Sequence, residues 1–495
     1  MGVIRRQGIK NSIYNYLGVG LGYINMALIM TNVLSAEEYG LRGVIFRLGS
    51  FFSMAALLGT ANIVNRYFPH FKNKETRHGD LLSFILTYLG VGIILGAILT
   101  IALKSFAFSS YSNVPFLLDY YYEIIPFGAS LALFEALSAY CRVLLKSTVP
   151  VFVREVGVRI LTTILLGLLA WGIIDFNQFF LAYLYSNTVG AFVLAGYLVK
   201  IGEFNIKLRI SFWRFPMFIE MVKFGTYTMF NASINMVVRM TDMLMITYLM
   251  VGLAPAGIYD FGMLIANIVM VPATSLRQIA SPIVADAFKR NDMKQLADIY
   301  NKTSTTQLVA GLFIFCIVVL NLPSLLLVMK SDFAQAEYVV YLMGITRIFD
   351  MASGMNNRLI MESKYYRATL VFNLILMVLV ILTNWWFIPI YGITGAALAS
   401  AISVMIIILA KIVFVYRVFG FNPYDFDTVK SVIVAVIALG AIYFLPIIGN
   451  VFVDIGYRTT LFVPLYIILV YKLKISEDIN KLAEPFVGKV LGSAK

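Results

Sequence analysis

Residues 367–419 decide the fold and read RATLVFNLILMVLVILTNWWFIPIYGITGAALASAISVMIIILAKIVFVYRVF. The stretch contains two apolar runs, each about as long as the roughly 20 residues that a helix needs to cross the hydrocarbon core of a bilayer. Pro389 and Gly392 separate the two runs. We expect Pro389 to end the first helix, Gly392 to form a tight turn, and the small residues at 395–399 to let the second helix pack closely.

The rest of the chain is equally apolar. Of its 495 residues, 60% are hydrophobic and only 13% are charged, which exceeds the apolar content of soluble proteins. We therefore predict an all-α, polytopic membrane protein with about fourteen transmembrane helices and no soluble domain. The predicted spans are Asn11–Leu34, Leu41–Tyr67, Leu81–Leu103, Tyr121–Leu144, Val151–Ile174, Gln178–Val199, Glu220–Met250, Ala256–Ala285, Thr305–Met329, Ala336–Met361, Arg367–Pro389, Ile393–Phe419, Val429–Ile448 and Ile455–Tyr471.

The lysines and arginines between these spans predict the orientation. With a cytoplasmic N-terminus, 25 of them fall on the cytoplasmic side, against Lys104, Lys330 and Arg458 outside. Basic residues are retained on the cytoplasmic side during insertion, so both termini are predicted to be cytoplasmic. The net charge of +13 then reflects topology and contact with anionic membrane lipids, and does not imply nucleic-acid binding.

Similar features recur about 220 residues apart. Tyr39 and Tyr259 follow the first and seventh predicted helices, and Lys146 and Lys364 open the fifth and eleventh. These offsets suggest two parallel six-helix repeats, a common plan among transporters. The predicted divisions are an N-terminal six-helix bundle at 1–205, a basic amphipathic cytoplasmic linker at 206–219, a C-terminal six-helix bundle at 220–420, and helices 13 and 14 with a cytoplasmic tail at 421–495.

Three short motifs resemble one known family. They are FIPIYGITGAALAS at 387–400, RRQGIKNS at 5–12 followed by LSAEEYG at 34–40, and RYFP at 66–69. Together they are similar to the polysaccharide-flippase branch of the multidrug/oligosaccharidyl-lipid/polysaccharide exporter superfamily. The resemblance implies alternating-access transport of polyprenyl-pyrophosphate-linked oligosaccharide repeat units from the inner to the outer leaflet, for polysaccharide or lipopolysaccharide biosynthesis. It also implies the inner membrane of a bacterium and, as partners, lipid-linked oligosaccharide, membrane lipids and other polysaccharide-assembly proteins.

Two relatives within the superfamily are alternatives. Drug exporters handle mostly cationic compounds, which an arginine-rich cavity would repel. Lipid II flippases typically carry an arginine-glycine-arginine pattern on helix one, whereas residues 17–30 contain no charge here. An enzyme using Glu37 and Glu38 as catalytic acids is a third alternative, but the predicted outer turn that carries them is short, and such enzymes usually have a large outer loop. We therefore expect no catalytic residue.

Charged residues inside apolar spans are costly and usually functional. A guanidinium fork holds phosphate oxygens with two parallel hydrogen bonds, so the arginines predict a net cationic, anion-binding cavity. Asparagines on the same helices are expected to contact sugar hydroxyls. The candidate substrate-binding residues are Arg47, Arg66, Arg154, Arg159, Arg239, Arg277, Arg347, Asn62 and Asn235.

Some of these arginines have acidic neighbours at helical spacing, so structural ion pairing is the competing interpretation. The spacing predicts pairs between Glu155 and Arg159, Arg239 and Asp242, and Arg347 and Asp350, and leaves Arg47 and Arg277 without a local acid. The candidates for coupling to a proton or sodium gradient are Asp242, Asp350, Glu135 and Glu155. No ATP-binding motif, metal-ligand pattern or cofactor motif is present in the sequence.

Overall fold

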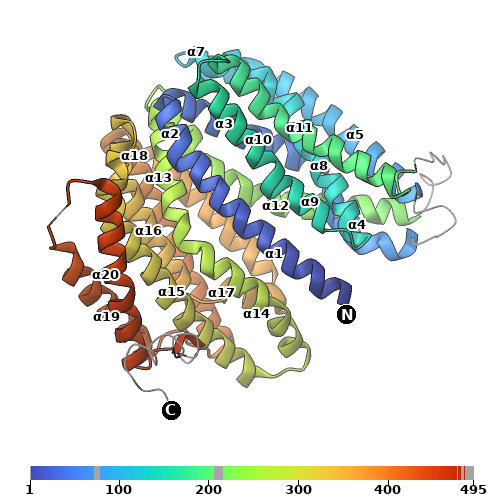
Figure 1. The fold of residues 1–495 in the computed structure, drawn as a ribbon. Coiled ribbons are helices and arrows are strands. Elements are labelled where there is room, and N and C mark those ends of the chain that lie inside the picture. Colours follow the sequence, from blue (N-terminus) through green and yellow to red (C-terminus); the bar gives the residue numbers. More distant parts are fainter. Residues whose placement is uncertain are drawn as a thin grey trace. The chain divides into compact units, whose positions relative to one another are not determined.

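The computed structural model describes residues 2–71, 79–205, 216–446, 448–476, 478–480 and 484, and this part of the chain is helical, without strands. Each of the fourteen predicted spans coincides with a helix or a run of consecutive helical segments (Figure 1). By length and composition alone, ten of the described helices are able to cross a membrane. Hydropathy thus predicted the fold class, and the protein is an all-helical, polytopic membrane protein.

The first part of the chain runs as far as α12. Its segments are α1 Gly2–Tyr23, the π-helix η1 Ile24–Ile29, α2 Met30–Val33, α3 Ala36–Leu57, α4 Thr60–Tyr67, η2 Phe68–Phe71, α5 Gly79–Ala102, α6 Lys104–Ser110, α7 Pro115–Asp119, η3 Tyr121–Glu123, α8 Ile124–Val143, α9 Thr148–Phe152, the π-helix η4 Val153–Gly157, α10 Val158–Ala170, α11 Phe176–Lys200 and α12 Pro216–Leu249.

The second part of the chain runs from α13 to α20. Its segments are α13 Leu253–Asn267, η6 Ile268–Met270, α14 Val271–Lys289, α15 Met293–Leu327, η7 Ser331–Ala336, α16 Glu337–Ala352, α17 Asn356–Glu362, α18 Arg367–Phe419, α19 Phe426–Tyr443 and α20 Val451–Lys472.

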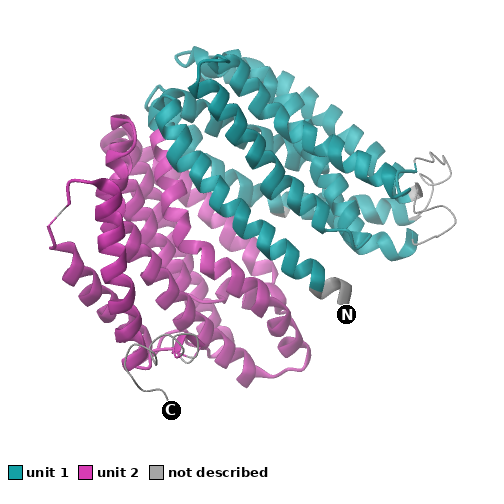
Figure 2. Ribbon diagram, viewed as in Figure 1, with its two compact units in different colours: residues 1–257 teal, residues 258–495 magenta. Residues whose placement is uncertain are grey.

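Packing divides the chain into unit 1, residues 1–257, and unit 2, residues 258–495 (Figure 2). The boundary lies inside α13, so α12 packs with the preceding helices. The two six-helix repeats were predicted from features that recur along the sequence. The division by packing does not test them, so they stay a prediction. Most of the predicted linker, residues 206–215, lies outside the described residues.

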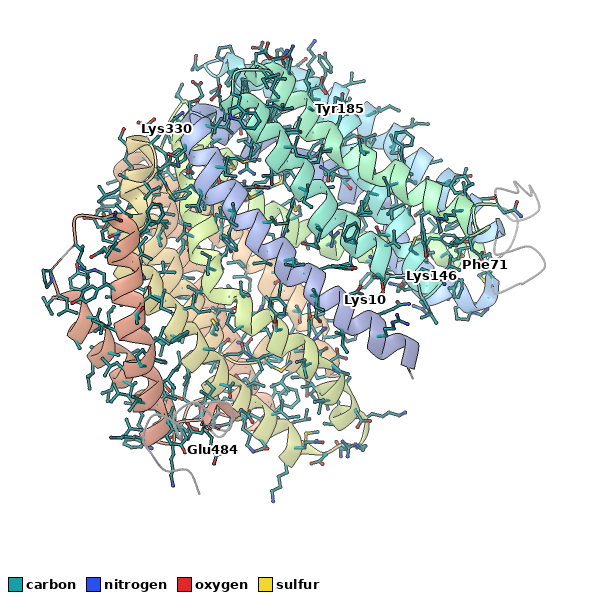
Figure 3. All side chains as sticks on the ribbon, viewed as in Figure 1. Lys10, Phe71, Lys146, Tyr185, Lys330 and Glu484 are labelled. Carbon is teal, nitrogen blue, oxygen red and sulfur yellow. The ribbon has the colours of Figure 1, made fainter. Side chains whose placement is uncertain are left out.

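In unit 1, α8 packs against α3, α5 and α11, and the segment α9–η4–α10 packs against α1 and α11. Two polar contacts join the first residues of α1 to the turn that follows α8: Gln7 donates to the carbonyl oxygen of Leu145, and Asn11 donates to Ser147 Oγ over 3.0 Å. Figure 3 shows Lys10 and Lys146 at the same end of the unit. The two predicted cytoplasmic segments therefore lie together, as the predicted topology requires.

In unit 2, α15 packs against α14, α16, α19 and α20. The core between α15 and the last two helices contains Phe462 and Tyr466, and the Tyr466 hydroxyl donates to the carbonyl oxygen of Val309 over 2.9 Å. The predicted turn in α18 is present at Gly392, whose φ of 57° is in the left-handed region. Pro389 itself remains helical, so the first helix ends at Gly392, three residues later than predicted.

Candidate functional site

Unit 1 contains a cavity of about 450 Å³ lined by α1, η1, α3, α8, η4, α10 and α11. Four of the predicted site residues line it together: Glu135, Arg154, Glu155 and Arg159. Its wall also includes Asn25, Ser50, Ser53, Thr162, Tyr183 and Asn187. A membrane cavity with polar walls and charged side chains is the usual form of a transport site.

The four charged side chains form a chain of alternating sign. Arg154 donates from Nη1 to Glu135 and from Nε to Glu155 Oε1 over 3.3 Å. Arg159 Nη2 lies 2.9 Å from Glu155 Oε2, which confirms the predicted pair at i and i+4. Glu155 therefore bridges both arginines, while Glu135 contacts Arg154 at the end of the chain.

Exposure differs along this chain of charges. The Arg154 side chain is 53% exposed and Glu135 33%, whereas Glu155 is 16% exposed. At the other end, Arg159 Nη1 is buried and has no hydrogen-bond partner among the described residues. The accessible fork in the cavity is therefore that of Arg154.

Two π-helical turns shape this cavity. η1 contributes Asn25, and η4 contributes Arg154 and Glu155. Asn25 Nδ2 donates to the carbonyl oxygen of Arg159 over 2.9 Å, and Thr163 Oγ1 donates to Asn25 Oδ1 over 2.8 Å. Single π turns inside α-helices are rare and frequent at functional sites. Asn25 therefore links the helix that contains η1 to the helix that contains η4 and α10, close to the ion-paired side chains.

Close packing of α1 fixes the position of η4. A methyl group added at Gly18 would lie 2.6 Å from the carbonyl oxygen of Glu155, and one added at Gly22 would lie 3.3 Å from Cζ of Arg159. Only glycine lets the two helices approach this closely. The spacing of Gly18 and Gly22 was a readable signal that the sequence analysis did not use.

Unit 2 contains a smaller cavity of about 280 Å³, lined by residues of α14, α16, α17 and the α16–α17 turn. Arg277 is held firmly at its wall: Nη1 donates to Asp350 Oδ2 over 3.1 Å, Nη2 to the Asp350 carbonyl oxygen over 3.2 Å, and Nε to Gln307 Oε1 over 3.1 Å. Arg358 and Asn356 line the same cavity. Asn356 is 4% exposed, and its Nδ2 has no hydrogen-bond partner among the described residues.

The structure shows partners that helical spacing did not predict. Arg277, predicted to have no local acid, pairs with Asp350, 73 residues away in sequence. Arg347, predicted to pair with Asp350, donates to Asn267 Oδ1 over 3.0 Å. Helical spacing places Asp350 near Arg347, but a helix packed alongside can supply a partner at shorter range, and sequence spacing does not reveal that partner.

The unit 1 cavity has no net positive charge, because two arginines face two glutamates there, and the net cationic transport cavity stays a prediction. In the unit 2 cavity, Arg277 and Arg358 exceed Asp350 by one charge. Membrane cavities rarely hold unpaired charges because an isolated ion is costly in a low dielectric.

The remaining candidates lie elsewhere in unit 1. Arg47 donates to the Gly43 carbonyl oxygen over 3.2 Å and contacts Met243 Sδ. Arg66 lies 4.0 Å from Glu220 Oε1 and covers the Phe224 ring at 4.5 Å. Asp242 is buried. Asn62 on α4 and both Asn235 and Arg239 on α12 are exposed. Ion coupling stays a prediction for Asp242, and cargo contact stays a prediction for the other five.

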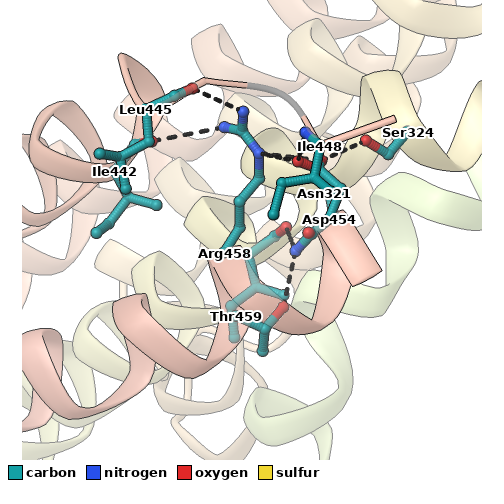
Figure 4. Close-up of polar contacts among 9 residues, drawn as sticks. Asn321, Ser324, Ile442, Leu445, Ile448, Asp454, Arg458 and Thr459 are labelled. Carbon is teal, nitrogen blue, oxygen red and sulfur yellow. Dashed lines mark hydrogen bonds and ion pairs between the residues drawn. The ribbon is translucent and has the colours of Figure 1, made fainter. Parts of the chain in front are cut away.

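A further ion pair, between Asp454 and Arg458 on α20, lies in unit 2 (Figure 4). Both side chains are buried, at 1% and 5% exposure. Asp454 also accepts from Ser324 Oγ over 2.7 Å and from the Ile448 backbone, and Arg458 Nη2 donates to the Leu445 carbonyl oxygen over 2.9 Å. Arg458 was predicted only as a basic residue of the outer face, and its i, i+4 spacing to Asp454 is the sequence signal for this pair.

Comparison with known families and solved structures shows which known fold this chain resembles. The family model MatE matches residues 228–386, and a search of curated proteins gives no match. Among the described residues, no group of three acidic, histidine or cysteine side chains is arranged to hold a metal ion.

Three solved structures illustrate the similarity. The lipid II flippase MurJ in an inward closed conformation is 16% identical, with a TM-score of 0.72 over 94% of this chain and 98% of MurJ. An inward-facing multidrug resistance MATE family transporter of the MOP superfamily is 11% identical, with a TM-score of 0.61 over 83% of this chain and 94% of that one. A MOP superfamily transporter from Pyrococcus furiosus, described as having a binding pocket of reverse polarity, is 12% identical, with a TM-score of 0.55 over 83% and 95%. The chain therefore has the all-helical fold shared by MurJ and the MATE transporters.

Proposed function

We propose that the protein is a flippase that moves lipid-linked anionic oligosaccharides from the inner to the outer leaflet of the bacterial cytoplasmic membrane. The observation that carries the proposal is that each unit places an arginine fork, Arg154 or Arg277, in the wall of a cavity. Such a fork matches phosphate oxygens in geometry and charge, and it stays charged at every physiological pH.

The mechanism follows from the chemistry of such a cargo. A pyrophosphate and its sugars are too polar to cross lipid alone, so the protein has to replace their hydration with fixed donors while the polyprenyl tail stays in the bilayer. Arginine forks supply donors for the phosphate, and side chains such as Asn25 and Asn356 supply amide groups of the kind that bind sugar hydroxyls. Alternating access of the cavities to the two leaflets then moves the head group.

A second candidate is a cation or drug antiporter of the same fold. The specific observation in its favour is that Glu135 and Glu155 line the unit 1 cavity, where a carboxylate would attract a cation. Against it, the fold match to MurJ extends over 94% of the chain, whereas the match to the multidrug transporter extends over 83%.

Reconstitution distinguishes the two candidates. Proteoliposomes would contain a fluorescent polyprenyl-pyrophosphate oligosaccharide, and a membrane-impermeant quencher would report the label in the outer leaflet. We expect protein-dependent exchange of the label between leaflets and no transport of tetraphenylphosphonium. Transport of the organic cation without movement of the lipid would favour the antiporter and overturn the proposal.

A further inference from the structure

The four charges in the unit 1 cavity leave Arg154 occupied. Its guanidinium contacts the carboxylates of both Glu135 and Glu155, so an anion that uses this fork has to replace one of them. The unit 1 cavity of a protein that carries an anionic cargo thus contains its own competing anions.

The two glutamates are not equivalent competitors. Glu155 holds two arginines and is 16% exposed, so its removal breaks two ion pairs and uncouples Arg154 from Arg159. Glu135 holds one arginine and is 33% exposed. Replacement of Glu135 therefore breaks fewer contacts than replacement of Glu155.

We propose that Glu135 is an internal competitor of the cargo phosphate for Arg154, and that the phosphate displaces the Glu135 carboxylate from Arg154 when it binds. This inference rests on the proposed function and names the residue that regulates its site. Without the Glu135 charge, Arg154, Glu155 and Arg159 carry one net positive charge, which the phosphate neutralises. The Glu135 carboxylate and the phosphate therefore exclude each other at Arg154, so each weakens the binding of the other.

Other groups around Glu135 do not compete for Arg154 in the same way. The charged and titratable side chains that line the cavity with it are Arg154 and Glu155 on η4, Arg159 on α10 and Tyr183 on α11. The residues that α1, η1, α2 and α3 contribute to the lining are neither charged nor titratable. Glu135 is the more exposed of the two carboxylates.

The test measures binding of radiolabelled sulfate to the full chain in lipid nanodiscs. Sulfate resembles a phosphate group and serves as the probe of the Arg154 fork. We expect Glu135→Gln to bind sulfate about tenfold or more tightly than wild type, within the usual range of coupling between two sites, because the neutral amide competes weakly for Arg154.

Matched variants keep the inference falsifiable. Glu123→Gln removes one charge just before α8, where Glu123 accepts from the Tyr185 hydroxyl over 2.7 Å, and it should behave like wild type. Arg154→Ala should lose most sulfate binding. Wild-type sulfate affinity in Glu135→Gln, or wild-type binding in Arg154→Ala, would overturn the inference. Glu135→Met serves as a second neutral variant if Glu135→Gln melts below the wild-type temperature.

Failure here is distinguishable from failure of the proposed function. Protein that flips lipid-linked oligosaccharide but binds sulfate equally well in wild type and Glu135→Gln would disprove the role of Glu135 alone. Sulfate binding linked to Glu135, without flipping of the lipid, would retain the anion site and disprove the proposed cargo.

Discussion

Two arginine–carboxylate pairs with the same i, i+4 spacing occupy opposite environments in this molecule. Asp454 and Arg458 on α20 are almost fully buried, and backbone carbonyls, a backbone amide and Ser324 complete their contacts. Glu155 and Arg159 border a cavity, continue into Arg154 and Glu135, and leave Arg159 Nη1 without a partner. An arginine–carboxylate pair thus serves as a structural pair where every donor atom has a partner and belongs to a candidate binding site where one has none.

The largest expected effect concerns the buried pair. Asp454→Ala leaves the Arg458 guanidinium buried without a counter-charge, so we expect the free energy of unfolding to fall by about 3–5 kcal/mol. Glu135→Ala in the cavity should cost no more than about 1 kcal/mol, because its partner Arg154 is half exposed. Thermal unfolding of both variants in the same detergent measures the difference. Equal destabilisation by the two substitutions would remove the distinction between the pairs.

The second largest expected effect comes from a substitution that disturbs the close contact between α1 and η4. Gly18→Ala places a methyl group 2.6 Å from the Glu155 carbonyl oxygen, so η4 has to shift at a cost of about 1–3 kcal/mol. We expect transport to fall sharply, since Arg154 and Glu155 move with η4. Gly20→Ala is the matched control, because nothing lies within 4 Å of a methyl group there. Equal transport by the two variants would show that the position of η4 does not control the cavity.

Substitution of Asn25 tests the contact between η1 and α10. Asn25→Ala removes hydrogen bonds to the Arg159 carbonyl oxygen and to Thr163, and we expect a loss of about 1 kcal/mol in stability. Asn32→Ala is the control, because Asn32 bonds only within its own helix, to the Leu28 carbonyl oxygen. Sulfate affinity should weaken for Asn25→Ala alone, and a larger loss for Asn32→Ala would contradict the account.

The smallest expected effect concerns an exposed ion pair, which gives the reference value for a surface contact. Asp298 and Lys302 are 59% and 52% exposed and lie 3.5 Å apart, so Asp298→Asn should change stability by no more than about 0.5 kcal/mol. Salt titration of thermal unfolding checks this. A cost similar to that of Asp454→Ala would mean that burial does not separate structural from surface pairs in this protein.

Hydropathy predicted the positions of the helices, because a membrane span needs a long apolar run. Gly392 predicted the turn in α18, because glycine adopts a positive φ without steric cost. Local spacing also predicted Glu155 with Arg159. The partners of Arg277 and Arg154 were not predictable, since Asp350 and Glu135 reach them from other helices, 73 and 19 residues away. The π turns at η1 and η4 depend on tertiary packing and carry no clear sequence signal.

The most direct test compares Arg154→Ala and Arg458→Ala in two assays, thermal unfolding and flipping of lipid-linked oligosaccharide in proteoliposomes. We predict that Arg154→Ala keeps its melting temperature and loses flipping, whereas Arg458→Ala unfolds at a much lower temperature. Wild-type flipping by stable Arg154→Ala would contradict the assignment of the unit 1 cavity as the anion-binding site.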